Sequence, residues 1–442
     1  MKIQDIVKEQ GVVGAGGAGF PTHVKLASPA RSVLVNAAEC EPLLHKDKQI
    51  LTHYPEIFFQ GLTRVMAAVG ADEGIIGIKA KHQALIARLR PALPAKVRIA
   101  EVDDFYPAGD EITLIREACN VIVPPGELPI SQGIVVNNVE SLYNMGKTGP
   151  VITKFLNLAG EVENRHTLEV PLGISFRELL AYARPLPGDY TVIEGGPMMG
   201  RIADDLDAVV TKTTAALIVL PSDHVLIRKY RDMARQNVVD RVGKAACDQC
   251  SFCTELCPRY LLGHPIQPHK AMRGLVFQGP GEDPRTIQAH AQYCCQCNLC
   301  SLISCPEGLY PSQVCIQHRS LALGSKVRYQ GPLSVGQGHP LAAYRKTPSS
   351  RLKTRLDLKR FPDTGELTAH DVTPARLTLM LRQHIGGAAT PLVCPGDAVE
   401  PGMKIATMGD ALGAELHAPL AGIVDQVTAD AIVITTAPSA GN

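Results

Sequence analysis

The cysteines of this chain form its clearest chemical pattern. Ten of the 13 lie between Cys247 and Cys315, in two runs that read CDQCSFCTELCP from residue 247 and CCQCNLCSLISCP from residue 294. The first run has the C-x2-C-x2-C-x3-C-P spacing of proteins that hold two iron–sulfur clusters. In such proteins three cysteines wrap one corner of a cluster and the fourth ligates the other cluster. We therefore predict two [4Fe–4S] clusters.

The crossed pattern assigns four thiolates to each cluster. The first cluster is predicted on Cys247, Cys250, Cys253 and Cys305, and the second on Cys257, Cys294, Cys297 and Cys300. The second run departs from the pattern, because four residues rather than three separate Cys300 from Cys305 and because Cys295 is added. The sequence therefore leaves open whether Cys305 or another cysteine completes the first cluster. Paired zinc sites are the alternative, but they leave two consecutive C-x2-C-x2-C triplets unexplained.

A second candidate site is the glycine-rich stretch GAGGAGFPTHVK, residues 14–25. It satisfies the G-x-G-x-x-G pattern of a dinucleotide fingerprint, which requires a strand directly before the first glycine. The preceding IQDIVKEQGVV is polar with a helical period, and the apolar strand SVLVNAAE follows at 32–39. Glycines that run into a helix start with a lysine nearby can hold a phosphate. A glycine-rich surface loop is the alternative on this pattern alone.

Composition limits the remaining possibilities. A chain of 442 residues is too long for one core and indicates roughly three or four domains. Its 44 Lys and Arg nearly cancel its 43 Asp and Glu, so no global field attracts nucleic acid or an anionic membrane. No apolar run is long enough to span a bilayer, and the start MKIQDIVKEQ lacks a signal peptide's apolar stretch. We expect a cytoplasmic protein that binds no nucleic acid and is not integral to a membrane.

Four motifs occur in the order found in one known group of proteins: GAGGAGFPTHVK, VNAAECEP (35–42), YPAGDEITLI (106–115) and VVNNVESL (135–142). They resemble the flavin- and NADH-binding subunit of respiratory complex I and the RnfC subunit of ion-pumping Rnf complexes. This resemblance implies an α/β domain that binds FMN and accepts electrons from NADH, rather than a doubly wound dinucleotide domain.

The resemblance also implies residue roles. Backbone and ammonium groups of Gly14, Gly16, Gly17, Gly19 and Lys25 would hold the FMN phosphate and the approaching NADH. Asn36, Asn137 and Asn138 match asparagines that contact the flavin, Glu39 and Glu41 match acidic positions beside the nucleotide, and Glu111 matches a Gly-x-Glu motif. Phe20 is a candidate for stacking on adenine. Ala38 replaces an aspartate of the complex I subunit, so the grip on the nicotinamide nucleotide is expected to differ.

The rest of the chain predicts a multidomain α/β protein. Residues 1–150 form the FMN/NADH domain, 151–225 resemble a β-grasp (SLBB) module, and 226–330 are helical around the two [4Fe–4S] clusters. Residues 331–372 are predicted to be a basic linker, and 373–442 resemble a lipoyl-like barrel-sandwich whose hairpin MGDALGAEL lacks a modifiable lysine. The stretch GGPMMG, residues 195–200, predicts a tight turn with two packed methionines and no chemistry.

This order of domains, together with CPRYLLGHPIQPHK (257–270), resembles the cobalamin reductases of propanediol-utilisation microcompartments. The resemblance implies NADH-dependent reduction of cobalamin to cob(I)alamin, with an adenosyltransferase and a microcompartment shell protein as partners. Hydride and electron transfer need no general acid or nucleophile, and we predict no such catalytic residue. An RnfC-type subunit of a membrane ion pump and a flavin-free electron carrier are the two alternatives.

Overall fold

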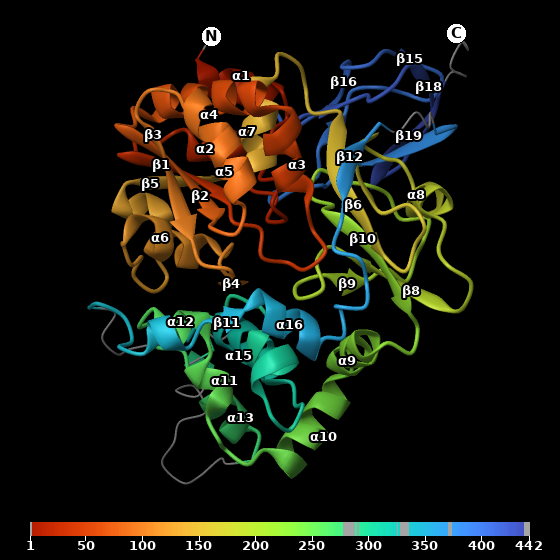
Figure 1. The fold of residues 1–442 in the computed structure, drawn as a ribbon. Coiled ribbons are helices and arrows are strands. Elements are labelled where there is room, and N and C mark those ends of the chain that lie inside the picture. The colour runs from red at the N-terminus through yellow and green to blue at the C-terminus, as the bar shows by residue number, and fades with distance from the viewer. Residues whose placement is uncertain are drawn as a thin grey trace.

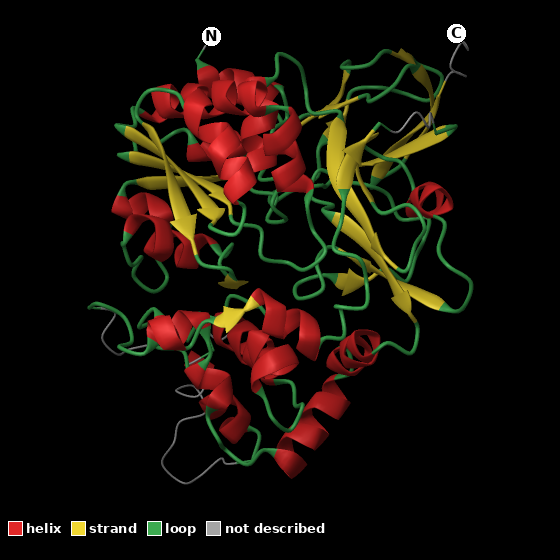
Figure 2. Cartoon of the chain, viewed as in Figure 1, coloured by secondary structure: helices red, strands yellow, loops and turns green. Residues whose placement is uncertain are grey.

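The computed structural model describes residues 2–276, 288–289, 291–324, 326–327, 336–369 and 374–436. Figure 1 shows three lobes: an α/β lobe of N-terminal residues, a β lobe where the middle and C-terminal parts of the chain meet, and a helical lobe beneath both. Figure 2 shows the same division by secondary structure, since strands fill the β lobe and helices fill the lower one. Among the residues described, no helix has the length and apolarity to cross a bilayer.

A parallel sheet organises the α/β lobe. Its strand order is β3 (Val97–Val102), β2 (Glu73–Lys79), β1 (Ser32–Ala37) and β5 (Ile134–Asn138). The central strand β1 reads SVLVNA, and five of its six residues are buried. Such continuous apolar strands are expected where helices cover both faces of a sheet.

Alternate side chains of β1 face the two helix layers. Val33 and Val35 pack into a core shared with α4 and α7, whereas Leu34 packs with Leu114 and Ile115 of α6. The first layer comprises α1 (Ile3–Glu9), α3 (Lys46–His53), α4 (Pro55–Val69), α5 (Gln83–Leu89) and α7 (Val139–Gly146), and α6 (Glu111–Cys119) lies on the other face (Figure 1). Shorter elements are α2 (Thr22–Lys25), η1 (Arg90–Ala92), η2 (Pro129–Gln132) and β4 (Phe105–Tyr106).

Among the described residues, the β lobe contains three sheets and one helix. The largest has the order β12 (Glu366–Thr368), β7 (His166–Pro171), β6 (Thr153–Gly160), β10 (Ala216–Pro221), β8 (Tyr190–Glu194) and β9 (Arg201–Ile202), with α8 (Phe176–Ala183) beside it. The C-terminal sandwich pairs β13 (Arg376–Met380), β19 (Ala431–Thr436), β18 (Gly422–Val427) and β15 (Ala398–Val399) with β14 (Thr390–Pro391), β16 (Lys404–Thr407) and β17 (Leu416–His417). The turn from β16 to β17 carries no lysine.

The helical lobe carries both cysteine runs. Its elements are α9 (Val225–Met233), α10 (Gln236–Ala246), α11 (Phe252–Glu255), α12 (Pro258–Leu261), α13 (Pro268–Gly274), η3 (Cys300–Ser304), α15 (Pro311–Gly324), η4 (Ala342–Tyr344), β11 (Thr347–Pro348) and α16 (Ser349–Arg355).

The stretch that the sequence predicts to be a basic linker joins all three lobes. β11 pairs with β4 of the α/β lobe, and β12 adds a strand beside β7 of the β lobe. Between them, Leu352 of α16 and Leu356, which directly follows that helix, are fully buried. Lys and Arg side chains at the surface coexist with this packing because apolar residues recur on one helix face. Residues 331–335 and 370–372 of the stretch lie outside the described residues.

A buried carboxylate connects the first two lobes. Glu140, at the start of α7, has only 1% of its side chain exposed, and its Oε2 forms ion pairs with Lys154 of β6 and with Lys46 of α3, the latter at 3.1 Å. Phe155 N–H donates to its Oε1 at 3.0 Å. Burial alone would raise the pKa of Glu140, but the charges of Lys154 and Lys46 hold it below its ordinary value. Both oxygens of this carboxylate are thus engaged by groups of the two lobes.

We predict that Glu140→Gln lowers the free energy of unfolding by about 3–5 kcal/mol, because buried Lys154 loses its carboxylate partner and buried Lys46 keeps only Asp47. The wild type's advantage should be present above about pH 4.5, the unfolded value, and should shrink as the pH falls through the lowered pKa of Glu140. Urea denaturation of both proteins at several pH values measures this. Glu101→Gln is the control, because the Glu101 pair with Arg90 is 34% and 59% exposed and is worth less than about 1 kcal/mol. Equal midpoints for the two variants at neutral pH would contradict the role of Glu140.

Candidate functional site

Residues 14–19, the glycine loop, form a closed turn at the edge of the α/β lobe. Gly14 N–H donates to Phe20 O at 2.9 Å, and Gly19 N–H donates to Gly14 O at 3.1 Å. Gly17 has a φ of +103°, and a Cβ placed there would have no neighbour within 4 Å. The loop is therefore tied at its base, while its tip faces open space in a conformation that favours glycine.

The glycine loop packs on the start of α7. Ala15 N–H donates to Ser141 Oγ at 2.9 Å, and a Cβ on Gly16 would lie 3.5 Å from the Asn138 side chain. Asn138 ends β5 and caps α7, with its Oδ1 accepting from Glu140 N–H at 3.0 Å. Lys154, the ion-pair partner of Glu140, also donates to Ala15 O at 3.4 Å. The buried charges described above thus hold the loop in place.

The predicted asparagines lie at the same edge of the sheet. β1 and β5 run parallel in register, so that Asn36 lies opposite Asn138 and Asn137 precedes it. Asn36 Nδ2 donates to Gly109 O at 2.7 Å, which brings the turn before α6 to this edge. Open α/β sheets bind their ligands at the carboxyl ends of the strands. The structure therefore gathers these side chains and the glycine loop at a binding edge.

Three predicted residues lie around this group with partners of their own. Lys25 Nζ donates to Val136 O at 3.0 Å and lies 3.7 Å from Glu111 Oε1. Its ammonium therefore bridges β5 and the start of α6. Phe20 closes the base of the loop through its carbonyl and is half-buried.

The predicted acidic pair follows β1 and lines a cavity of about 260 Å³. Burial, and then the charge of Asp47, raise the pKa of Glu39. Burial raises the pKa of Glu41 to about 8, although Met198 N–H donates to its Oε2 at 2.8 Å. Glu41 therefore keeps its proton at neutral pH, and carboxyl groups with such raised pKa values are concentrated at functional sites.

The residues at this edge fit the FMN that the sequence implies. Among the described residues, Asn137 is 3% exposed and its Nδ2 has no hydrogen-bond partner, so it remains available as a donor to a bound group. Gly17 and Gly19 also line a cavity of about 580 Å³ with Arg201 and Arg382. Backbone N–H groups and guanidinium groups are the usual ligands of phosphate.

The two cysteine runs share one backbone conformation. In the first, Gln249 and Ser251 have φ values of +62° and +68°; in the second, Gln296 and Asn298 have +58° and +56°. Non-glycine residues rarely adopt this conformation, so its repetition fixes the register between the runs. Cys294, and not Cys295, then corresponds to Cys247.

Hydrogen bonds to sulfur repeat in the same register. The Gln249 side-chain Nε2 donates to Cys247 Sγ at 3.3 Å, and the backbone N–H of Gln296 donates to Cys294 Sγ at 3.4 Å. N–H groups directed at sulfur are a normal feature of iron–sulfur ligation. Cys295 takes the place of Asp248, which lies outside the triplet spacing.

The extra residue of the second run is accommodated in a π-helical turn. η3 (Cys300–Ser304) is a π-helix, and Cys305 N–H donates five residues back to Cys300 O at 3.1 Å. π-turns add one residue to a helix and often occur at functional sites. As a result Cys305 has φ −71° and ψ 119°, nearly the −68° and 121° of Cys257. Both cysteines precede a proline.

One cavity is lined by Cys247, Cys250, Cys253 and Cys305, which we name the first thiol group. Burial, followed by the charge of Cys305, raises the pKa of Cys253 to about 12. Iron binding must therefore release a proton from this thiol. No set of three His, Cys, Asp or Glu side chains in the described ranges surrounds a point where a single metal ion could sit.

The second thiol group comprises Cys257, Cys294, Cys297 and Cys300. Three of its members, Cys257, Cys297 and Cys300, are each 8% exposed. Arg259 lies two residues after Cys257; it pairs with Asp110 at 2.9 Å, and its buried Nη1 has no partner among the described residues. A buried cation with a free donor beside these thiols fits a cluster whose thiolates carry net negative charge.

The turn at residues 195–200, for which the sequence predicts only packing, connects the edge of the parallel sheet to the second cysteine run. Met198 N–H donates to Glu41, and Met198 O accepts from Asn298 Nδ2 at 2.8 Å, so one residue links the sheet edge to the second cysteine run. Gly196 allows this approach, because a Cβ there would collide with the Glu41 carboxylate. The prediction of two packed methionines is wrong for Met199, which is 56% exposed: the turn uses Met198 for the link and leaves Met199 outside.

Sequence reasoning also missed Tyr106. Its hydroxyl donates to Cys297 O at 2.8 Å, and its ring, on β4, is buried in a cluster that includes Cys297 and Leu299. Only the tertiary fold brings Tyr106 to Cys297, so no local signal could have found it. The position of Arg259 next to Cys257 was a possible signal for a charge near the cluster.

Models of three known domain families match three separate parts of the chain. Residues 7–147 match the Nuo51 FMN-binding domain, 246–310 match the 4Fe-4S dicluster domain, and 360–439 match the RnfC barrel sandwich hybrid domain. These matches confirm the predicted FMN domain, the paired [4Fe–4S] clusters and the C-terminal barrel-sandwich.

Full-length similarity decides the family. The cobalamin reductase PduS of Citrobacter freundii is 41% identical over 98% of this chain and 96% of that relative, and PduS of Salmonella typhimurium is 39% identical over the same shares. The chain belongs to the PduS family of cobalamin reductases. A component of the Na(+)-translocating ferredoxin:NAD(+) oxidoreductase complex of Acetobacterium woodii is 32% identical, over 59% of this chain and 58% of that component. The PduS resemblance extends over the whole chain, whereas the RnfC-type resemblance is partial.

For this PduS family member we predict that Gly17→Val abolishes FMN binding and leaves both clusters intact. Valine would strain a φ of +103° and would occupy the open tip of the glycine loop. Gly70→Val is the matched control, because Gly70 has a φ of +66° and equally open space at the end of α4. Both variants should lose roughly 1–2 kcal/mol from backbone strain. Flavin and iron analyses of the purified proteins measure the FMN and cluster content of both variants. Wild-type flavin content in Gly17→Val would contradict the assignment of the glycine loop.

The register of the second run predicts opposite results for two adjacent cysteines. Cys294→Ala should remove about one cluster's worth of iron, because its sulfur corresponds to Cys247. Cys295→Ala should retain the iron of both clusters. Iron content and the EPR signals of the reduced proteins measure this, and the reverse pattern would shift the ligand frame by one residue.

Proposed function

We propose that this protein is an NADH-dependent cobalamin reductase, in which electrons pass from NADH to FMN, then to the [4Fe–4S] clusters, and then to cobalamin. One observation in this PduS family member carries the proposal. Glu41 at the nucleotide edge and Asn298 in the second cysteine run both form hydrogen bonds with the backbone of one residue, Met198. The two sites are therefore one hydrogen-bonded residue apart.

The electron count requires a cofactor between donor and acceptor. Each NADH leaves NAD⁺, one proton and two electrons, which reduce two cob(II)alamin to two cob(I)alamin. FMN, when bound, takes up a hydride and passes its electrons on singly. The chain's own residues supply the phosphate cradle, through the glycine loop, and the donor Asn137 Nδ2.

Glu41 and Met198 keep the passage between the sites dry and fixed. Glu41, with its pKa raised to about 8 by burial, is neutral when the reaction runs at neutral pH and adds no negative charge at the nucleotide edge. Met198 is fully buried, so its side chain excludes water from the space that it fills between the sheet edge and the second thiol group. Arg259 supplies the compensating positive charge on the cluster side.

The PduS relatives also suggest the setting. We place the activity inside a propanediol-utilisation microcompartment, with a cobalamin adenosyltransferase consuming cob(I)alamin and a shell protein as neighbour. The stretch from Arg345 to Arg360 has seven Lys or Arg against one Asp. Arg351, which is exposed on α16, belongs to this charged surface and suits an acidic partner.

The order of electron transfer is tested by removing one ligand of the second cluster. Cys257→Ala with matched FMN content should keep NADH-dependent reduction of a two-electron dye, because hydride uptake needs only the flavin site. The same variant should lose most cob(II)alamin reduction. Stopped-flow spectra should show flavin bleaching without the subsequent cob(I)alamin band. Wild-type rates of cob(I)alamin formation would mean that electrons leave directly from the flavin.

A further inference from the structure

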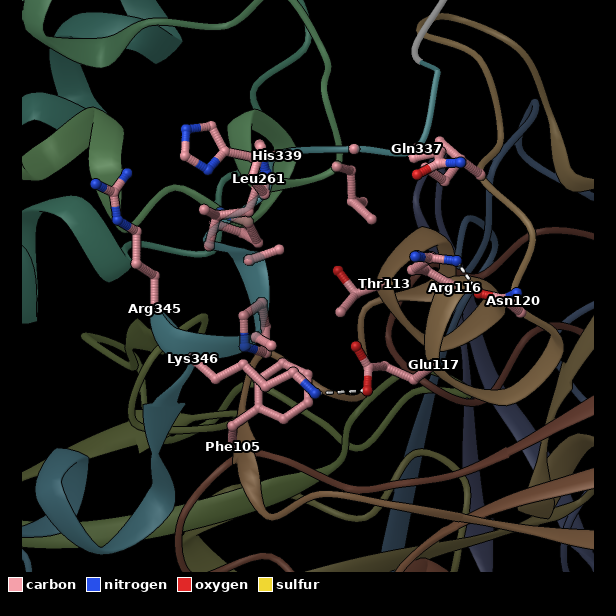
Figure 3. Close-up of a pocket in the computed structure, with 18 of the residues that line it drawn as sticks. Phe105, Thr113, Arg116, Glu117, Asn120, Leu261, Gln337, His339, Arg345 and Lys346 are labelled. Carbon is pink, nitrogen blue, oxygen red and sulfur yellow. Dashed lines mark hydrogen bonds and ion pairs between the residues drawn. The ribbon is translucent and has the colours of Figure 1, made fainter.

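One cavity lined by described residues lies between the α/β lobe and the helical lobe. It has a volume of about 900 Å³ and is bounded by β4 and α6 on one side, the start of α12 on another, and residues 336–346 on a third. Figure 3 shows Phe105, Glu117 and Asn120 facing Leu261 and His339 across it. Small-molecule sites typically have volumes of roughly 300–1,000 Å³ and lie where domains meet.

The walls of this cavity are the chain neighbours of the second thiol group. Leu256 directly precedes Cys257 and Leu299 directly precedes Cys300, and both side chains line the cavity. Tyr106 lines it too and donates to Cys297 O at 2.8 Å. Three of the four predicted ligands of the second cluster are thus one residue or one hydrogen bond from the cavity. None of the residues of the first thiol group lines it.

The lining combines apolar and polar side chains. Leu256, Leu261 and Leu299 are among its apolar lining residues, and Asn120, Gln337 and Arg345 are among its polar ones. Lys346 pairs with Glu117 at 2.7 Å and with Asp103 at 2.8 Å, and its Nζ lies 4.8 Å from the Phe105 ring centre, so its charge is paired within the protein. Such a lining suits a broad, flat, apolar molecule whose edge carries uncharged amide groups.

We infer that this cavity binds the corrin ring of cobalamin, with the second cluster as its immediate electron donor. The corrin is a flat macrocycle ringed by acetamide and propionamide side chains, which would pair with the amide and guanidinium groups of the lining. The inference rests on the proposed function and adds the place where the substrate binds. It also makes the second thiol group, rather than the first, the exit of the electron path.

The cavity offers cobalt no nitrogen ligand from the described residues. Its one imidazole among these lining residues is His339, whose Nδ1 accepts from Leu341 N–H at 3.1 Å. In the neutral tautomer Nε2 then carries the hydrogen and acts as a donor, not as a metal ligand. Lys346 is held by Glu117 and Asp103. Cobalt(I) in a corrin ring binds no axial ligand, so a site without one favours the reduced product.

Two tryptophan substitutions test the site in the holoenzyme. Ala343 and Gln337 are exposed cavity residues, so that Ala343→Trp and Gln337→Trp fill the cavity without disturbing a packed core. Tyr344→Trp is the matched control, since Tyr344 belongs to the same short helix η4, is 86% exposed and is not among the lining residues. The measurements are kcat/KM for cob(II)alamin, binding of hydroxocobalamin by equilibrium dialysis, and NADH-dependent dye reduction.

Both cavity variants should lose about tenfold or more in kcat/KM for cob(II)alamin and bind hydroxocobalamin correspondingly more weakly. Dye reduction and the Tyr344→Trp control should stay at wild-type values. If the wild type reduces cob(II)alamin and both cavity variants match it, the site assignment is wrong while the proposed function stands. If the wild type reduces the dye but no cobalamin, the proposed function fails. New nitrogen splitting in the EPR spectrum of bound cob(II)alamin that disappears in His339→Ala would contradict the unligated cobalt.

Discussion

The buried Glu140 carboxylate is the interaction on which both nucleotide binding and lobe assembly depend. It fixes Lys154 at the start of the β lobe, and Lys154 in turn holds the carbonyl of Ala15 in the glycine loop. Asn138, which packs against the glycine loop, caps α7, and Glu140 is the second residue of that helix. A change in how the lobes pack would therefore move the tip of the glycine loop. Charges this deeply buried need full pairing, so this arrangement has one stable geometry.

The second constraint is the backbone conformation that the two cysteine runs share. Two cysteine runs with paired left-handed residues and matching backbone angles at Cys257 and Cys305 place four thiols in each of two related groups. The π-turn at Cys300–Ser304 explains how a sequence with one residue too many retains this relation. The link through Met198 and the hydrogen bond from Tyr106 then bring the second thiol group against both the sheet edge and the large cavity.

Local sequence was sufficient for features that depend on spacing alone. The two triplets, the strand SVLVNA and the glycine loop could be predicted because cluster geometry, burial on both faces and positive φ each select residue types at short range. The gathering of Asn36, Asn137 and Asn138 followed from the family resemblance, and parallel register explains it. The contacts of Tyr106, Met198 and Arg259 could not be predicted, because each joins segments about 100 residues or more apart, as the 191-residue separation of Tyr106 and Cys297 illustrates. A basic composition likewise concealed the burial of Leu352 and Leu356 between Arg345 and Arg360.

The central claim is that electrons from NADH reach the corrin through groups held within this one chain. Anaerobic titration of the reconstituted holoenzyme with NADH in the presence of hydroxocobalamin, followed by optical spectroscopy, tests it most directly. The account predicts that flavin and cluster absorbance is restored after each addition of NADH while cob(II)alamin and then cob(I)alamin accumulate, until no oxidised corrin remains. Flavin and clusters that stay reduced beside unchanged hydroxocobalamin would contradict it.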